Sequence, residues 1–174
     1  MDSHYDQVMK SRAAQEGQAE RRYFAYSTVL DRAAFEEWRN QHGYQFFALP
    51  EGELAAAQDV ELVYDFPSRW WGGRVAGLGD RAGSQVFGKL MTISAKDWPL
   101  IQHKEGAITG MSVEREVTVR CGGKEEKAIA FTTRPERASY EGPVSTAFVQ
   151  ALMRGATAAG LPQSYLDFIR TSAR

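Results

Sequence analysis

The stretch IQHKEGAITGM, residues 101–111, carries the side chain best suited to acid–base chemistry, Glu105. This glutamate follows a short predicted helix whose apolar residues, Trp98 and Ile101, would face the core and could carry it inward. A carboxylate withdrawn from water has a raised pKa, which suits it to act as a general base near neutral pH. The alternative is a solvated glutamate in the last helical turn beside Gly106, because most glutamates lie on the surface. The sequence leaves both interpretations open.

A second candidate site lies in RRYFAYSTVLDRAAF, residues 21–35, where a strand pattern runs directly into a helix pattern. Strand character fills Tyr23–Tyr26, and the helical pattern begins at Asp31. Such a junction leaves backbone N–H groups without partners inside the helix, and these groups can bind an anion. The alternative is a capped helix start without a ligand, since Thr28 and Asp31 have the spacing of a capping box.

Metal and nucleotide chemistry find little support in the sequence. His4, His42 and His103 include no pair at metal-ligand spacing, and Cys121, the only cysteine, has no metal-type partner nearby. No glycine-rich loop fits the Rossmann or P-loop pattern. We therefore expect neither a metal nor a cofactor.

The charge balance argues against nucleic acid as the main partner. The chain has 174 residues, with 21 Lys and Arg against 22 Asp and Glu and a formal net charge of -1. The segment RWWGGR, residues 69–74, pairs arginines with tryptophans and could stack on bases. Because no wider basic patch accompanies it, we favour a tight turn whose indoles pack on the core.

The totals are typical of one globular domain, with 43% apolar and 25% charged residues. A single cysteine excludes an intrachain disulfide and favours a reducing, cytoplasmic setting. No apolar stretch approaches the roughly 20 residues that span a bilayer, and the N-terminus lacks the apolar core of a signal peptide. We expect residues 1–22 to form a polar extension, either disordered or a loosely docked helix, and residues 23–174 to form the domain.

Strand patterns outnumber helix patterns, which predicts an α+β fold around a mostly antiparallel sheet that could close into a barrel. The sequence CGGK, residues 121–124, is typical of a hairpin turn between two strands. The predicted strands cover residues 23–27, 59–66, 84–93, 112–120 and 127–133, and the predicted helices cover residues 30–43, 97–106 and 143–162.

Five segments, in the same order, resemble the gamma-glutamylcyclotransferase family, enzymes that convert gamma-glutamyl amino acids into 5-oxoproline and a free amino acid. YFAYSTVL resembles the family's Tyr-Phe-Ala-Tyr-Gly-Ser-Asn-Leu, and SRWWGGRVAGL resembles its Trp-x-Gly-Gly segment. VFGKLMTI is similar to its Val-x-Gly strand, and GATAAGLPQSY to the end of its C-terminal helix. KEGAITGMSVEREVTV resembles the stretch that carries the family's acidic catalytic residue. The resemblance covers residues 23–165, most of the chain.

The resemblance implies a small, mixed, mostly antiparallel β-barrel with flanking helices and no metal or cofactor. It implies that Glu105 is the catalytic acid/base and that the partner is a small gamma-glutamyl substrate, with neither nucleic acid nor membrane involved. Because family members are often dimers, a homodimer is also expected. The substrate-binding residues implied are Tyr23, Phe24, Ala25, Tyr26, Ser27, Thr28, Val29, Leu30, Gly110, Met111 and Phe148.

This chain departs from the family pattern at two places. Ser27-Thr28-Val29 stands where the family has Gly-Ser-Asn, and Phe148 lies where some relatives carry a tyrosine. If the family's glycine needs a positive φ, Ser27 would cost of order 1 kcal/mol. Two functional hypotheses follow. The first is cyclisation of a gamma-glutamyl amino acid or amine to 5-oxoproline, and the second is a catalytically altered module that binds a gamma-glutamyl-like ligand.

Overall fold

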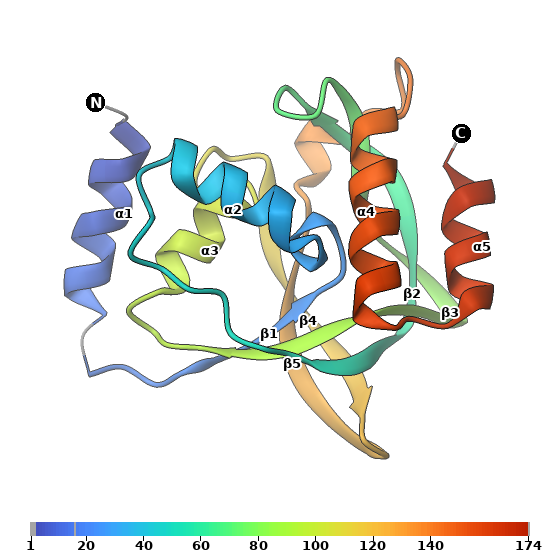
Figure 1. Cartoon of the computed structure of the whole chain (residues 1–174), viewed down its shortest axis with the longest axis horizontal. Helices are drawn as coiled ribbons and strands as arrows, with labels where there is room; N and C mark the ends of the chain where they lie inside the picture. Colours follow the sequence, from blue (N-terminus) through green and yellow to red (C-terminus); the bar gives the residue numbers. More distant parts are fainter. Residues whose placement is uncertain (1–2, 16, 174) are drawn as a thin grey trace.

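The computed structural model describes residues 3–15 and 17–173 and shows a five-stranded barrel with helices packed around it (Figure 1). In the view of Figure 1, α1 and α3 lie on the left, α4 and α5 lie on the right, and α2 lies between them. The elements in chain order are α1 (Ser3–Ala14), β1 (Arg21–Ala25), the 3₁₀ helix η1 (Thr28–Leu30), α2 (Arg32–Gln41), β2 (Glu53–Ser68), β3 (Gly73–Ile93), α3 (Trp98–Lys104), β4 (Ser112–Cys121), β5 (Lys124–Thr133), the 3₁₀ helix η2 (Pro135–Arg137), α4 (Thr146–Ala159) and α5 (Gln163–Ser172).

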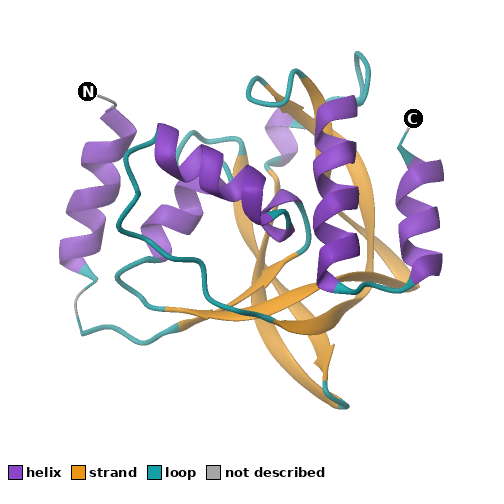
Figure 2. Cartoon of the chain, in the orientation of Figure 1, coloured by secondary structure: helices purple, strands orange, loops and turns teal. Residues whose placement is uncertain are grey.

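The strands close into a barrel in the order β1-β3-β2-β4-β5. All neighbours pair antiparallel except β1 and β5, which pair in parallel at Tyr23 and Ile129. Figure 2 shows the strands grouped together and the helices outside them. The predicted α+β class, a small and mostly antiparallel barrel with flanking helices, is therefore confirmed.

Two hairpins supply most of the sheet. The β4–β5 turn is made by Gly122 and Gly123, with φ of 56° and 80°, as the CGGK pattern predicted. The other hairpin joins β2 to β3, and both strands are much longer than predicted. Its register shifts between Gln58 and Val60, around Asp59 at φ 60°. This bulge interrupts the alternation of apolar and polar residues, so the pattern indicated only part of each strand.

The helices at the C-terminal end differ from the sequence prediction. The predicted helix over residues 143–162 corresponds to α4, which ends at Gly160 with φ 77°. A further helix, α5, follows it and was not predicted. Its buried Tyr165, Leu166 and Ile169 recur at helical spacing, but the segment is short. No helix among residues 3–15 and 17–173 is long and apolar enough to cross a membrane.

The N-terminal helix α1 packs against the rest of the molecule. Val8 has no exposed surface, and Tyr5 stacks on Tyr44 with ring centroids 5.6 Å apart. Arg12 forms an ion pair with Asp97, the residue that precedes α3. Within the predicted extension, residues 3–14 are thus a helix, while residues 1, 2 and 16 lie outside the described chain.

Candidate active site

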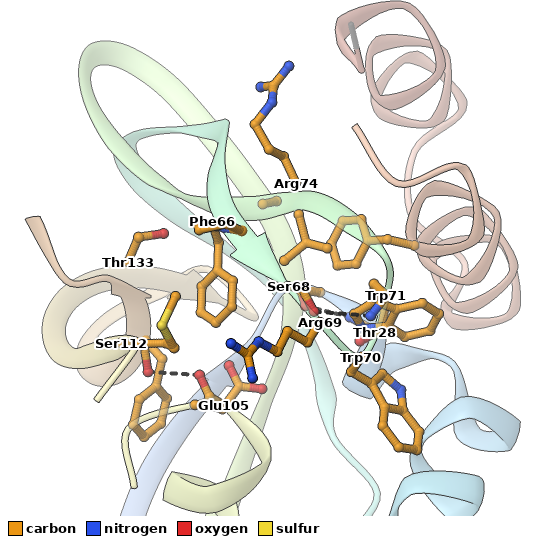
Figure 3. A pocket seen from close by; sticks show the side chains of 18 of the residues that line it. Thr28, Phe66, Ser68, Arg69, Trp70, Trp71, Arg74, Glu105, Ser112 and Thr133 are labelled. Carbon is orange, nitrogen blue, oxygen red and sulfur yellow. Dashed lines mark hydrogen bonds between the residues drawn. The ribbon is translucent and has the colours of Figure 1, made fainter. Parts of the chain in front are cut away.

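A cavity of about 780 Å³ opens at one end of the barrel. Its walls come from the loop after β1, the β2–β3 turn, the end of α3, the end of β5 and the start of α4. Figure 3 shows side chains from several of these elements pointing into the same space. Segments that are distant in sequence therefore converge on one site, with Glu105 among them.

Glu105 caps the C-terminal end of α3 and is half-buried in the cavity wall (Figure 3). Its backbone N–H donates to the carbonyl of Ile101 at 2.9 Å, and Gly106 follows at φ 87°. Trp98 and Ile101 are buried, so α3 is anchored in the way its apolar spacing indicated. The carboxylate therefore belongs to the cavity and is not a freely solvated surface group.

Residues of two barrel strands, β1 and β4, fix the position of Glu105. Tyr23, which is buried in β1, donates its hydroxyl hydrogen to Oε1 of Glu105 at 3.0 Å. The hydroxyl of Ser112, at the start of β4, donates to the backbone carbonyl of Glu105 at 2.7 Å. The carboxylate and the backbone of the same residue are thus each held by a separate hydrogen bond.

Burial raises the pKa of the Glu105 carboxyl above its usual value. The positive charge of Lys104 and the hydrogen bond from Tyr23 both lower that pKa, but desolvation is the larger effect. A carboxylate in this environment binds a proton more readily than a solvated one, so it can both take up and return a proton.

The loop after β1 has a negative φ at Ser27, where the family pattern has glycine. Ser27 has φ −124°, so the substitution for glycine creates no left-handed strain. Instead, the Ser27 hydroxyl accepts a hydrogen bond from the Thr28 N–H at 2.6 Å. One of the amides expected to face a ligand is therefore already occupied.

The predicted capping box is wrong. Asp31 precedes α2 but makes no side-chain capping bond. Its carboxylate forms an ion pair with Arg154 of α4, with N and O 3.0 Å apart. Arg154, which is distant in sequence, therefore binds the Asp31 side chain that the local spacing had assigned to the helix cap.

Helix α4 supports the loop from behind through Gly155. A Cβ atom added at Gly155 would lie 2.4 Å from the backbone nitrogen of Asp31 and 2.5 Å from the carbonyl carbon of Leu30. Both distances are too short for any real contact, so the close approach of α4 to the loop depends on glycine.

The structure brings only part of the predicted site together at the cavity. Tyr23 contacts Glu105 from behind but does not line the cavity. The binding roles of all these residues stay predictions. Lining the cavity are Tyr26, Ser27, Thr28, Glu105, Met111 and Phe148, whereas Phe24, Ala25, Val29, Leu30 and Gly110 are not part of its lining.

The β2–β3 turn contributes site residues that sequence reasoning had assigned to core packing. Trp71 is partly buried and contacts Phe148 edge-on, with ring centroids 5.9 Å apart. Trp70, however, is 45% exposed and lines the cavity beside Arg69, so the prediction that both indoles pack on the core is wrong for Trp70. The pairing of arginine and tryptophan in RWWGGR was the available signal.

One side of the cavity is aromatic. The ring of His42 stacks on Trp38 with centroids 4.4 Å apart and lies 5.7 Å from that of Trp70. His103 stands edge-on to Trp38, and its Nδ1 is 2.7 Å from the Tyr44 hydroxyl oxygen. Over residues 3–15 and 17–173, no group of three or more His, Cys, Asp or Glu side chains could hold a metal ion.

Comparison with known protein families gives a match over the second half of the chain. Residues 85–169 match the sequence model of the AIG2-like family. A search of curated protein sequences finds no match. The family match spans the end of the β2–β3 hairpin, α3 with Glu105, the β4–β5 hairpin and both C-terminal helices.

Solved structures share the fold across most of the chain. A gamma-glutamyl cyclotransferase is 23% identical, with a TM-score of 0.74 and 87% of each chain covered. An uncharacterized protein from Homo sapiens is 25% identical, with a TM-score of 0.72, over 87% of this chain and 86% of the other. YkqA from Bacillus subtilis is 19% identical, with a TM-score of 0.73, over 95% of this chain and 58% of its own. The resemblance inferred from the sequence is confirmed at the level of the fold.

Proposed function

Because this chain has the gamma-glutamylcyclotransferase-like fold, we propose that it cyclises the gamma-glutamyl group of an amino acid or amine derivative to 5-oxoproline. The observation that carries the proposal is the half-buried Glu105 carboxylate at the cavity, held by Tyr23 and with its pKa raised by burial. A carboxylate of this kind is suited to move a proton between two nitrogen atoms of one substrate.

The reaction requires a proton to leave one nitrogen and reach another. Glu105 takes a proton from the α-ammonium of the substrate, and the nitrogen lone pair then attacks the δ-carbonyl carbon. The new carbon–nitrogen bond closes the ring and leaves negative charge on the carbonyl oxygen. When that intermediate collapses, the bond to the leaving nitrogen breaks and Glu105 returns its proton to that nitrogen. The regenerated Glu105 carboxylate then takes the second proton from the positively charged ring nitrogen, which becomes the lactam N–H, and passes that proton to solvent. The products are 5-oxoproline and the free amine.

The cavity must also fold the substrate, because the attacking amine and the carbonyl belong to one flexible molecule. Holding such groups at reacting distance contributes greatly to rate. The rigid backing of the cavity fits this requirement, since Phe148 and Thr28 are almost fully buried where they line it. We propose that these walls hold the gamma-glutamyl chain in its bent form.

A second candidate function is a module that binds a gamma-glutamyl-like ligand without turnover. The hydrogen bond from the Thr28 N–H to Ser27 favours it, because that amide is not available to a substrate anion. The retained Glu105 and its partners favour the enzyme. Cytoplasmic location and a homodimer stay predictions under either function.

The deciding experiment is a mass-spectrometric assay for 5-oxoproline. The purified protein would be incubated with a panel of gamma-glutamyl amino acids and gamma-glutamylamines, with the Glu105→Gln variant as control. We expect product with the wild type and none with the variant. Binding of panel members without any product would instead support the module, and equal activity in the variant would remove Glu105 from the mechanism.

A further inference from the structure

Arg69 is a cationic side chain at the cavity that the mechanism above does not use. It lies in the exposed turn between β2 and β3, and Figure 3 shows its side chain extending into the cavity toward Glu105. Arg69 makes no hydrogen bond or ion pair with any residue in the described chain. An arginine that reaches into a cavity without a protein partner is available to an anionic ligand.

The other cations that line the cavity have different surroundings. Arg74 points away in Figure 3, and its guanidinium donates to the backbone carbonyls of Tyr64 and Gly142 at 2.6 and 2.9 Å. The ammonium group of Lys104 lies over the ring of Trp38, 5.7 Å from its centroid. Arg69 is therefore the cavity cation best placed to bind an anion opposite Glu105.

The loop after β1 offers one backbone donor fewer to an anion, so a cation elsewhere in the cavity is the alternative partner. The Thr28 N–H is bonded to the Ser27 hydroxyl, so it is not directed at a ligand. A substrate carboxylate entering this half of the cavity must find another donor, because a buried charge without a partner is strongly unfavourable. The planar guanidinium of Arg69 could supply two parallel N–H donors to one carboxylate.

We propose that Arg69 binds the α-carboxylate of the gamma-glutamyl group while Glu105 binds the α-ammonium. This inference rests on the proposed cyclotransferase function. The two substrate groups are attached to the same carbon atom, so they must be held by an anion and a cation that face the same small volume. Arg69 and Glu105 both line the cavity, and in Figure 3 the Arg69 side chain extends toward the Glu105 carboxylate. Arg69 thereby selects substrates that carry a free α-carboxylate.

Covalent geometry indicates which of the two substrate carboxylates Arg69 binds. In a gamma-glutamyl amino acid, the carboxylate of the leaving group is separated from the α-carbon by several bonds beyond the δ-carbonyl. When the α-ammonium is at Glu105, the α-carboxylate is the nearer of the two anions. Binding of the distant carboxylate by Arg69 is the competing outcome that the experiment must separate.

The test measures kcat and KM for the wild type, Arg69→Gln, Arg69→Lys and Arg137→Gln. Arg137 is exposed and does not line the cavity, so its variant controls for the loss of one surface charge. Three probes would be used: gamma-glutamylalanine, its α-carboxamide analogue, and gamma-glutamylethylamine, which lacks a leaving-group carboxylate. Thermal unfolding of each variant checks that the fold is kept.

We expect Arg69→Gln to raise KM about 10- to 100-fold for both probes that carry the α-carboxylate, the usual effect of losing a charge-assisted hydrogen bond. The α-carboxamide probe should bind equally well to the wild type and Arg69→Gln. Arg69→Lys should fall between them, since it keeps the charge but not the paired donors. Arg137→Gln should match the wild type.

Three results would overturn the inference. The first is an Arg69→Gln variant that behaves like Arg137→Gln. The second is a KM increase limited to gamma-glutamylalanine, which would assign Arg69 to the leaving-group carboxylate. The third arises if the wild type turns over no probe, so that the proposed function fails. Calorimetric titration of gamma-glutamylalanine would then decide, because equal affinity in wild type and Arg69→Gln, or no binding to either, contradicts carboxylate binding by Arg69.

Discussion

Two walls of the cavity are built in different ways. On one wall, Glu105 is held through its carboxylate by Tyr23 and through its backbone by Ser112, and both partners come from barrel strands. On the second wall, Arg69 and Trp70 project from an exposed turn. The first wall is held by partly buried hydrogen bonds, and the second consists of exposed side chains that line the cavity.

Under the proposed function, the two walls have different roles: the first transfers protons and the second recognises the ligand. A proton-transferring group must be held at a fixed position and in a defined environment, and a strand-anchored wall provides both. Recognition can change with the side chains of a turn, since substitutions there leave the core intact. Arg69, which makes no hydrogen bond or ion pair within the described chain, lies on the second wall, while Ser27 lies in a separate segment, the loop after β1. Under the proposed function, the strand-anchored wall would carry the acid–base chemistry, and the exposed turn would select the ligand.

The largest effect should come from the chemical wall. Glu105→Gln keeps the shape and the hydrogen bond from Tyr23 but removes the group that accepts the proton. We expect kcat for 5-oxoproline release to fall at least 10²- to 10⁴-fold, roughly the contribution of general acid–base catalysis. Steady-state assays with gamma-glutamylalanine measure it. Circular dichroism must show an unchanged fold, and a loss of less than tenfold would place the proton transfer elsewhere.

Gly155 tests whether the loop after β1 depends on the close packing of α4 against it. Gly155→Ala would bring a methyl group into the backbone of Leu30 and Asp31. Helix propensity favours alanine by about 1 kcal/mol, but overpacking costs about 1–3 kcal/mol, and here the contact is with backbone that cannot rotate away. We therefore expect a net decrease in the free energy of unfolding, measured by urea denaturation.

The matched control for Gly155 is Thr157→Ala, on the exposed side of the same helix. It replaces a weaker helix former without creating a clash, so its stability should be equal to or higher than that of the wild type. A Gly155→Ala variant as stable as this control would show that the loop and α4 can separate at little cost.

Variants at Ser27 test whether the Thr28 N–H can bind the substrate. Ser27→Gly and Ser27→Ala both remove the hydroxyl that occupies the Thr28 N–H. If that amide then donates to the substrate, kcat/KM should rise about tenfold, the effect of one added hydrogen bond. Because Ser27 has no positive φ, the alanine variant should gain as much as the glycine variant. No gain in either would mean that the Thr28 N–H does not face the substrate.

The smallest effect is expected from Tyr23→Phe, which changes the environment of the chemical wall without removing its carboxylate. The hydrogen bond from Tyr23 lowers the pKa of Glu105, so its loss should raise that pKa further. The active form is the carboxylate, and activity is lost as pH falls through the pKa. The acid limb of the kcat profile should therefore move to higher pH. A limb that stays in place or moves to lower pH would contradict the assignment of that limb to Glu105.

The sequence predicted the fold best where patterns are local. The Gly122-Gly123 turn and the end of α4 at Gly160 follow from residue type alone, because each needs a left-handed backbone. The bulge at Asp59 could not be predicted, since it depends on how two long strands pair across the barrel. The same reason explains why Asp31 was assigned to a helix cap although Arg154, far along the chain, holds it.

For a related reason, some residues of the candidate site could be predicted from the sequence and others could not. Glu105 could be proposed because Trp98 and Ile101 show which face of α3 is buried, and that information is local. The position of Arg69 depends on where the β2–β3 turn lies relative to α3, which only the closed barrel determines. Sequence spacing could not show that a surface turn and the end of a helix face one cavity.

The docking of α1 has a consequence for the design of shortened versions of the protein. Arg12 pairs with Asp97 just before α3, and Glu105 lies at the other end of that short helix. A version trimmed to begin at Tyr23 would lose this ion pair together with the buried side chain of Val8. Residues that look dispensable by composition therefore contact the start of the helix that ends at Glu105, and we expect a tag or fusion placed at that end to affect the cavity.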